Sequence, residues 1–241
     1  MNYYSIVIPT FNDEKIIKKK IILLNKKLKK LAVKYEIIII NDGSADKTYS
    51  ELLKISRKYK LVLINNKINR GKSYSINEGL KKSKYKFVIL IDSDLPYFSS
   101  FNKILKKLEE NYDFVFVNRR HEKSKIINRQ LNFYQKSRYL IGYIISLVVR
   151  LALNINIYGG DTQSGLKGFK KIKNFKKLKF ISSKFFLDLE IMYYYKKLNK
   201  KFYPIPVKYK IDDKSSIRLF SFKKNCEIIV ELFRAISSLR N

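Results

Sequence analysis

The sequence predicts an α/β domain built on a mostly parallel, mixed sheet flanked by helices, with an amphipathic helix at its C-terminal end. Three observations support this prediction. Short β-branched runs alternate with helical patterns in the first half, several runs end in turn-forming residues, and 46% of the 241 residues are hydrophobic. Strands that alternate with helices form right-handed βαβ units, and a chain of this size can bury a sizeable core.

The predicted strands of the first half are short apolar runs at residues 4–8, 36–40, 61–64, 86–91 and 113–117. Between them, apolar residues recur at the spacing of an amphipathic helix. This pattern predicts helices from residue 17 to about 31, from 44–46 to about 59, over 71–83 and from about 99. The side chain of Ser44 or Asp46 can cap the second of these helices.

The second half is less regular. A polar, basic stretch at 119–138 leads into an apolar helix at about 139–153, and a glycine-rich polar segment follows at 158–169. After a helix at about 187–198 and a strand at about 202–209, a helix from about 221 carries apolar residues on one side: Ile228, Ile229, Leu232, Phe233 and Ile236. We expect one main domain at 1–215 and an amphipathic extension at 216–241 that can lie on a membrane surface.

No apolar stretch reaches the roughly 20 residues that span a bilayer. The segment at 139–153 is either a buried helix or one that lies at the membrane interface. The first ten residues run straight into a strand pattern, so we expect no signal peptide. The single Cys226 excludes an internal disulfide, and the single His121 excludes a histidine-based metal site.

The chain is strongly basic, with 52 Lys and Arg against 20 Asp and Glu and a net charge of +32. Nucleic acid, an anionic membrane surface or a compositional preference for lysine would each explain this charge. The lysines are spread over every predicted helix and form no single block. We therefore favour compositional preference, then membrane attraction, and expect no nucleic acid partner.

Polar residues follow the predicted strands where ligands of parallel sheets bind, outside the carboxyl ends. These segments are Pro9 to Asp13, Asn41 to Ser44, Asn69 to Lys72 and Asp92-Ser93-Asp94. Two carboxylates spaced like Asp92 and Asp94 can hold a divalent cation that also binds a diphosphate. Each motif alone is more often turn chemistry, but acids at three strand ends favour a binding site.

These segments resemble the motifs of family 2 glycosyltransferases, which have the GT-A fold. Residues 8–13 resemble the opening Pro-Thr-Tyr-Asn-Glu of that family, residues 41–48 its Asp-Asp-Gly-Ser-x-Asp-x-Thr, and residues 92–94 its Asp-x-Asp. Residues 160–169 resemble an Arg-Asp-Thr-Gln-Cys-Gly-Phe-Lys-Leu-Phe block that is typical of dolichyl-phosphate β-glucosyltransferases and bacterial polyprenyl-phosphate relatives. Phe11, Asp13, Asn41 and Gly160 depart from the family's usual Tyr, Glu, Asp and Arg.

The resemblance implies a role for each matching residue. Pro9, Phe11, Asp13, Asp42, Lys72, Asp92 and Ser93 would bind the nucleotide sugar, with Phe11 on the base and Asp42 at its edge. Asp94, with Asp92, would bind Mg²⁺ or Mn²⁺, and Arg119, Arg129 and Arg218 would bind an acceptor phosphate. Asp161 would be the carboxylate nearest the reacting centre, or alternatively a turn acid, with Gln163, Asp188 and Glu190 in supporting positions.

The resemblance therefore implies an inverting transfer of a hexose to a polyprenyl or dolichyl phosphate, with UDP-glucose preferred over GDP-mannose as donor. Such a phosphate is largely ionised at neutral pH, because its second pKa is about 6, so no strong base is needed. We expect a cytoplasmic protein, peripheral on the cytoplasmic face of a membrane or bound to a membrane-protein partner. The alternatives are a family 2 enzyme with a saccharide acceptor and, more remotely, a nucleic-acid-binding protein.

Overall fold

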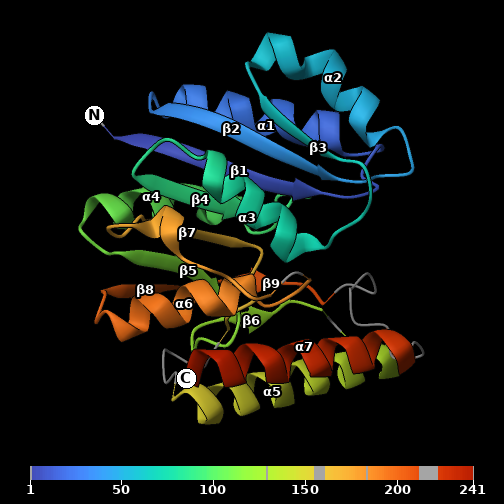
Figure 1. The fold of residues 1–241 in the computed structure, drawn as a ribbon, viewed down its shortest axis with the longest axis vertical. Helices are drawn as coiled ribbons and strands as arrows, with labels where there is room; N and C mark the ends of the chain where they lie inside the picture. The colour runs from blue at the N-terminus through green and yellow to red at the C-terminus, as the bar shows by residue number, and fades with distance from the viewer. Residues whose placement is uncertain (1, 129, 155–160, 183, 212–221, 241) are drawn as a thin grey trace.

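The computed structural model describes residues 2–128, 130–154, 161–182, 184–211 and 222–240. A seven-stranded sheet of order β3-β2-β1-β4-β7-β5-β8 forms its centre (Figure 1). Its strands are β1 (Tyr3–Thr10), β2 (Lys34–Asp42), β3 (Val62–Asn66), β4 (Phe87–Ile91), β5 (Phe114–Asn118), β7 (Leu166–Lys170) and β8 (Phe202–Pro206). Neighbouring strands are parallel except that β7 runs antiparallel to both β4 and β5. The predicted mostly parallel, mixed sheet is confirmed.

Helices cover both faces of this sheet. On one face, α1 (Ile17–Lys30), α2 (Thr48–Tyr59) and α4 (Phe101–Glu109) share a core with residues such as Ile6 and Ile8 of β1. On the other face, α3 (Lys72–Lys82) and α6 (Leu187–Lys197) pack over the side chains that point the opposite way, such as Val7. Because both faces are covered, the central strands read as continuous apolar runs.

The second half departs from its predicted boundaries at two places. Helix α5 (Phe133–Leu153) begins before residue 139, because Asn132 and Gln135 form a capping box. In it, the Gln135 backbone N–H donates to Asn132 Oδ1 at 2.8 Å, and the Asn132 N–H donates to Gln135 Oε1 at 3.2 Å. The predicted strand at 202–209 is two strands, since β9 (Lys208–Tyr209) leaves β8 and pairs in parallel with β6 (Lys125–Ile126).

Two short 3₁₀ turns and two polar contacts near the strand ends complete the fold. Two 3₁₀ turns lie at Phe98–Ser100 and Phe175–Lys177. Of the two predicted caps of α2, Asp46 orders the helix start, since its Oδ1 accepts the Thr48 N–H at 2.9 Å. Ser44 instead accepts the backbone N–H of Asn12 at 2.9 Å and so ties the β1 end to the β2 end.

Helix α7 (Phe222–Arg240) lies beside α5 below the sheet (Figure 1). Its Ile228, Leu232 and Ile236 are buried in the cluster that also contains Val149 and Leu153 of α5. The predicted boundary at residue 215 falls outside the described residues, and the division into 1–215 and 216–241 stays a prediction. None of the described helices is long and apolar enough to cross a bilayer.

Candidate active site

The carboxyl ends of β1 and β4 are joined through one carboxylate. Asp13 Oδ2 accepts hydrogen bonds from Thr10 Oγ1 at 2.8 Å and from Ser93 Oγ at 2.5 Å. Since β1 and β4 are parallel neighbours, the predicted motifs at 9–13 and 92–94 meet at one edge of the sheet. Phe11, beside Asp13, is 45% exposed, so its ring is available to stack on a planar ligand.

Asp42, at the end of β2, lies buried beneath the loop that leads to α3. Its Oδ1 accepts from Asn66 Nδ2 and from the Arg70 N–H, both at 3.0 Å, and its Oδ2 accepts from the Gly71 N–H at 2.9 Å. The carboxylate is only 2% exposed. Asp42 therefore orders the loop before Lys72 in this structure, and its contact with a base edge stays a prediction.

Lys72, the first residue of α3, and Asp92, which follows β4, form an ion pair at the carboxyl ends of the strands. Lys72 Nζ lies 2.6 Å from Asp92 Oδ1, and both side chains are partly exposed. Gly165 makes room for this carboxylate, because a Cβ there would stand 2.7 Å from Asp92 Oδ2. Burial lowers the pKa of Lys72, but the charges of Asp92, Asp188 and Asp94 together outweigh this effect, and the pKa is raised overall. Lys72 is therefore a fixed cation at neutral pH.

Asp94 is exposed beside this pair, at the start of an unusual backbone segment. Leu95 and Tyr97 have φ of 55° and 56°, a left-handed conformation that non-glycine residues adopt rarely and often at functional sites. Loss of hydration and the nearby charge of Asp92 raise the pKa of Asp94. A cation placed there would relieve that repulsion.

The donor set at this edge suits a cation that a substrate helps to hold. No cluster of three or more His, Cys, Asp or Glu able to bind a metal occurs among the described residues. Mg²⁺ in proteins is usually held by one or two carboxylates together with substrate phosphates and water. Asp92 and Asp94 fit that pattern, with a diphosphate as the remaining ligand.

Arg119 and Asp161 form the second part of the site. Arg119 Nε and its backbone N–H both donate to Asp161 Oδ2 at 2.8 Å, and Nη2 donates to Oδ1 at 2.7 Å. Burial raises the pKa of Asp161, but the charge of Arg119 and these hydrogen bonds prevail and lower it. Burial raises the pKa of the Tyr97 hydroxyl, and the charges of Arg119, Asp161 and Asp94 all act on it. Tyr97 therefore connects the two parts of the site.

Arg120 is a site cation that the sequence analysis did not single out. Its Nη2 donates to the Gly142 carbonyl of α5 at 2.6 Å, and its guanidinium lies 5.5 Å from the ring centroid of Tyr143. Burial lowers the pKa of Arg120. Of the predicted phosphate ligands, Arg119 lies in the site, whereas Arg129 and Arg218 lie outside the described residues.

The three predicted supporting residues lie on the α3 and α6 side of the sheet. Gln163 Nε2 donates to the Phe185 carbonyl at 3.0 Å. Glu190 accepts from the backbone N–H groups of Ile181 and Ser182, and burial raises its pKa. Asp188 pairs with Lys167, whose Nζ lies 2.9 Å from Asp188 Oδ2. These contacts order the loop before α6.

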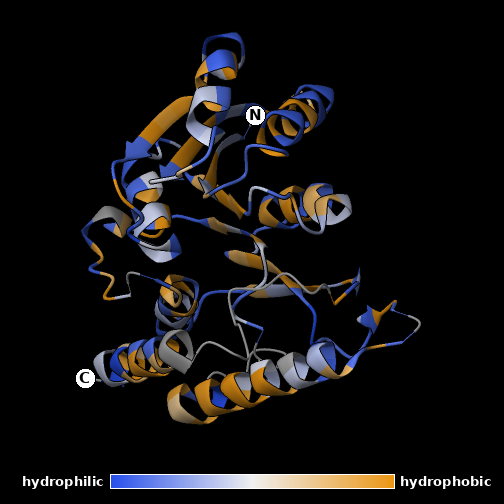
Figure 2. Ribbon diagram, turned by 90° about the vertical axis from the view of Figure 1, so that its right-hand side faces the viewer, coloured by the Kyte–Doolittle hydropathy of each residue, from blue (hydrophilic) through white to orange (hydrophobic). Residues whose placement is uncertain are grey.

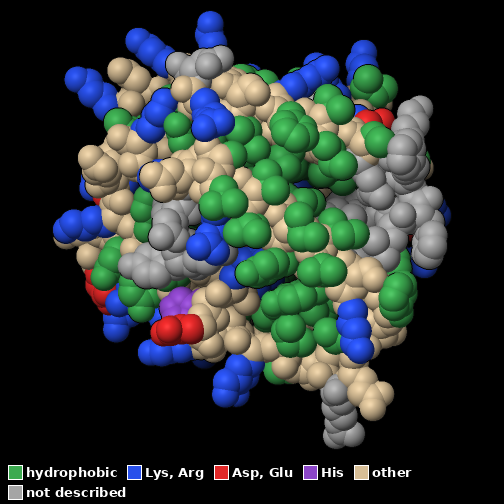
Figure 3. All heavy atoms as spheres, turned by 90° about the horizontal axis from the view of Figure 1, so that it is seen from below, with side chains coloured by type: hydrophobic (Ala, Val, Ile, Leu, Met, Phe, Trp, Pro, Cys, Tyr) green, Lys and Arg blue, Asp and Glu red, His purple; other side chains and the backbone are tan. Residues whose placement is uncertain are grey.

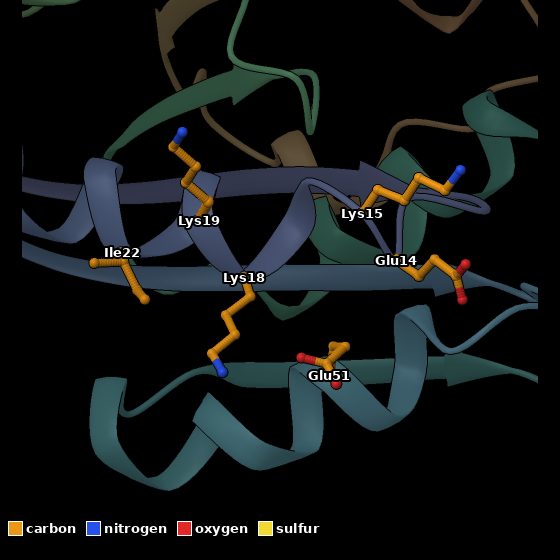
Figure 4. A pocket seen from close by; sticks show the side chains of 6 residues that line it. All are labelled: Glu14, Lys15, Lys18, Lys19, Ile22 and Glu51. Carbon is orange, nitrogen blue, oxygen red and sulfur yellow. The ribbon is translucent and has the colours of Figure 1, made fainter.

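A separate shallow pocket lies between α1 and α2 (Figure 4). Figure 4 shows Lys18 extending toward α2 and Glu51, while Lys15 and Lys19 point away from Glu51. The side chains converge on no common point, so the pocket offers little to a specific ligand.

The family model described as glycosyl transferase family 2 matches residues 5–224, which is most of the chain. The chain belongs to glycosyl transferase family 2. The predicted family membership is confirmed, and the protein is a glycosyltransferase.

Relatives of this family 2 glycosyltransferase differ in their acceptors. A dolichyl-phosphate beta-glucosyltransferase of Trichomonas vaginalis is 25% identical over 244 residues, which cover 95% of this chain and 72% of the relative. A poly-beta-1,6-N-acetyl-D-glucosamine synthase of Staphylococcus aureus is 39% identical, but over 77 residues that cover 28% of this chain and 19% of the relative. The long match and the short match of higher identity thus belong to enzymes with different names.

Solved structures confirm the GT-A fold of this family 2 glycosyltransferase. Glucosyl-3-phosphoglycerate synthase from Mycobacterium tuberculosis, in complex with Mn²⁺, UDP-glucose and phosphoglyceric acid, matches with a TM-score of 0.66 at 15% identity. The match covers 98% of this chain and 80% of that chain. A divalent cation and a UDP-sugar thus occur together in a structural neighbour.

Proposed function

We propose that this glycosyltransferase transfers a hexose, with inversion, from a nucleoside diphosphate sugar to a polyprenyl or dolichyl phosphate. The observation that carries the proposal is the state of Asp161. Both its oxygens are occupied by Arg119, and its pKa is lowered. A carboxylate held in this way is a poor base. An acceptor phosphate, already ionised near neutral pH, needs no base.

On the donor side, the nucleotide would lie over the end of β1, with Phe11 against the base and Asp13 and Ser93 near the ribose. Asp94 and Asp92 would hold Mg²⁺ or Mn²⁺ together with the diphosphate. When bound, the cation neutralises negative charge on the departing nucleoside diphosphate. Lys72 supplies a further fixed positive charge there. We propose UDP-glucose as the donor, supported by the dolichyl-phosphate beta-glucosyltransferase relative.

On the acceptor side, Arg119 and Arg120 would orient the lipid phosphate toward the sugar. Guanidinium groups suit this task, because their planar donors match phosphate oxygens. Positioning of an ionised nucleophile accounts for most of the catalysis in this proposal. Asp161 would hold Arg119 in this orientation through both carboxylate oxygens.

An exposed apolar face supports a lipid acceptor. Seen from below, hydrophobic side chains gather over α5 and α7 (Figure 3), and hydrophobic residues run along much of α5 (Figure 2). The exposed members include Phe133, Leu140, Ile144, Leu147, Leu151, Ile229, Val230 and Phe233. We define these eight residues as the α5–α7 face. Exposed Lys136 and Arg234 on the same helices would contact anionic headgroups.

The α5–α7 face leads us to propose a peripheral position on the cytoplasmic face of a membrane. Apolar side chains at the headgroup boundary, flanked by cations, are typical of helices that lie in the interface. A membrane-protein partner could occupy the same face. A saccharide acceptor is the second candidate function, supported by the 39% identity to poly-beta-1,6-N-acetyl-D-glucosamine synthase over 77 residues.

The test is transfer of radiolabelled sugar from UDP-glucose or GDP-mannose to undecaprenyl phosphate or dolichyl phosphate with Mg²⁺ or Mn²⁺. Undecaprenol, which lacks the phosphate, and a β-linked oligosaccharide serve as matched acceptors. We expect labelled lipid only with the phosphate, and none after EDTA. Labelled oligosaccharide without labelled lipid would favour the saccharide acceptor. Absence of turnover with every donor and acceptor would contradict the proposed substrates.

A further inference from the structure

Lys167 is a charged residue in the middle of the hydrophobic sheet. It lies on the interior strand β7, where it is in register with Leu90 of β4 and Phe116 of β5. Both neighbours belong to the core on the α3 and α6 side. The Lys167 side chain is only 3% exposed. An ammonium group in such a place is costly unless it is paired and hydrogen-bonded.

Asp188 of α6 supplies the compensating charge. Lys167 Nζ lies 2.9 Å from Asp188 Oδ2, whose side chain is 10% exposed, and it also donates to the Thr162 carbonyl at 3.2 Å. Asp188 Oδ1 is buried and has no hydrogen-bond partner among the described residues. One oxygen of this carboxylate therefore acts on its surroundings through its charge alone.

The buried pair lies directly behind the Lys72–Asp92 pair. Both pairs line one small cavity, together with Pro9 of β1 and Ser164 of the predicted Asp161 block. Lys72 interacts electrostatically with Asp188 as well as Asp92, and Lys167 interacts with Asp92 as well as Asp188. Four alternating charges from α3, α6 and the ends of β4 and β7 thus form one cluster.

We propose that the buried Lys167–Asp188 pair is a positioning element of the active site, which fixes Lys72 and Asp92 from the core side and thereby sets the affinity for the nucleotide sugar. The inference rests on the proposed function in one respect, that Lys72 and Asp92 contact the donor. Lys167 and Asp188 themselves touch no substrate; they act through the other pair.

Stability alone does not account for a buried pair at this position. Replacing a buried ion pair by apolar residues of similar volume is often neutral or stabilising, because the desolvation penalty disappears. Removing one partner is destabilising, because the other charge is left unpaired. If the pair held only the fold, a Leu–Met contact between β7 and α6 would serve as well.

This reasoning gives a test that separates positioning from folding. The Lys167→Met/Asp188→Leu double variant removes both charges and keeps an apolar contact. The matched control is Lys81→Gln/Glu78→Gln, an exposed pair with Nζ and Oε1 2.8 Å apart on α3, the helix that begins at Lys72. Melting temperature, UDP binding with Mn²⁺ by calorimetry, and kcat and KM for UDP-glucose are measured for both.

We expect the double variant to melt close to the wild-type temperature but to bind the donor about 10- to 100-fold more weakly, the usual cost of losing such support. KM should carry most of the loss, and the control should match the wild type. Wild-type KM and kcat in the double variant would overturn the inference, as would a double variant that does not fold. Failure of the wild type itself to bind UDP or UDP-glucose would instead contradict the proposed donor.

Discussion

Arg119 covers both oxygens of Asp161, with Nε 2.8 Å from Oδ2 and Nη2 2.7 Å from Oδ1. The acid is 2% exposed, whereas the guanidinium is partly exposed. This geometry makes Asp161 a fixed anion and leaves the outer side of Arg119 toward solvent. The pair therefore presents a positioned cation to an incoming anion, with its counter-charge buried behind it.

Loss of Arg119 should destabilise the fold as well as the site. Arg119→Ala leaves the buried Asp161 carboxylate without its ion-pair partner and with the backbone N–H of residue 119 as its remaining contact from that residue, so we expect the free energy of unfolding to fall by about 3–5 kcal/mol. Arg57→Ala, at an exposed position of α2, should change it by no more than about 0.5 kcal/mol. Urea denaturation of both variants measures the difference. Equal stability would contradict the ion pair as the main partner of Asp161.

The same pair predicts a pH dependence of stability. Because the pKa of Asp161 is lowered in the folded protein, its contribution is fully present above the unfolded value of about 3.9 and is lost as pH falls through the folded value. Asp161→Asn should therefore have a lower melting temperature than the wild type at pH 7. This difference in melting temperature, the gap, should become smaller below about pH 4. Melting temperatures from pH 7 to pH 2.5 test this, and a constant gap would refute it.

The part of the site at the strand ends can be predicted from the sequence, because the strands themselves can be located from it. Apolar runs locate β1, β2 and β4, and parallel strands bring their carboxyl ends to one edge. Asp13 and Ser93, far apart in the sequence, are in contact there. The family resemblance supplied the roles of these residues, which neither periodicity nor spacing contains.

The parts that escaped prediction depend on tertiary contacts. Strand β7 is hidden because Lys167 and Gly168 interrupt its apolar pattern; Asp188 compensates the charge, and Ile104 and Ile89 fill the space above the glycine. Tyr97 has no sequence signal, since its role depends on a backbone conformation. Arg120 does have one, its place directly after Arg119, but its contact with α5 depends on the fold.

Removal of the cation ligand should abolish most of the activity. We expect Asp94→Asn to lower kcat on the order of 10²-fold or more, because an oriented charge at the leaving group is lost. Asp113→Asn is the matched control. Asp113 lies at the amino end of β5, whereas the site lies at the carboxyl ends of the strands, and its carboxylate accepts from the Lys201 N–H. Both are compared over a Mn²⁺ titration. Normal Mn²⁺-dependent turnover in Asp94→Asn would exclude Asp94 as the ligand.

Glu231 of α7 should stabilise the loop before α6. Its Oε1 accepts from Ser182 Oγ at 2.5 Å and from the N–H groups of Lys184 and Phe185 at 2.7 and 3.2 Å. Glu231→Ala leaves these donors without their acceptor, which costs about 1–3 kcal/mol. Glu227→Ala, on the same helix, removes an exposed ion pair with Lys184, whose loss should cost about 1 kcal/mol or less. Equal melting temperatures in the two variants would contradict this role of α7.

Membrane attachment should depend on the α5–α7 face. Leu151 is 75% exposed on α5, and burying a leucine side chain in an apolar environment contributes about 1.5–3 kcal/mol. Leu151→Asp should therefore weaken binding to vesicles containing anionic lipid by about tenfold or more. Leu53→Asp is the matched control, because Leu53 is 49% exposed but lies on α2. Vesicle sedimentation measures both variants. Equal binding of the two would mean that charge alone attracts the protein to lipid, and that the apolar face serves another partner.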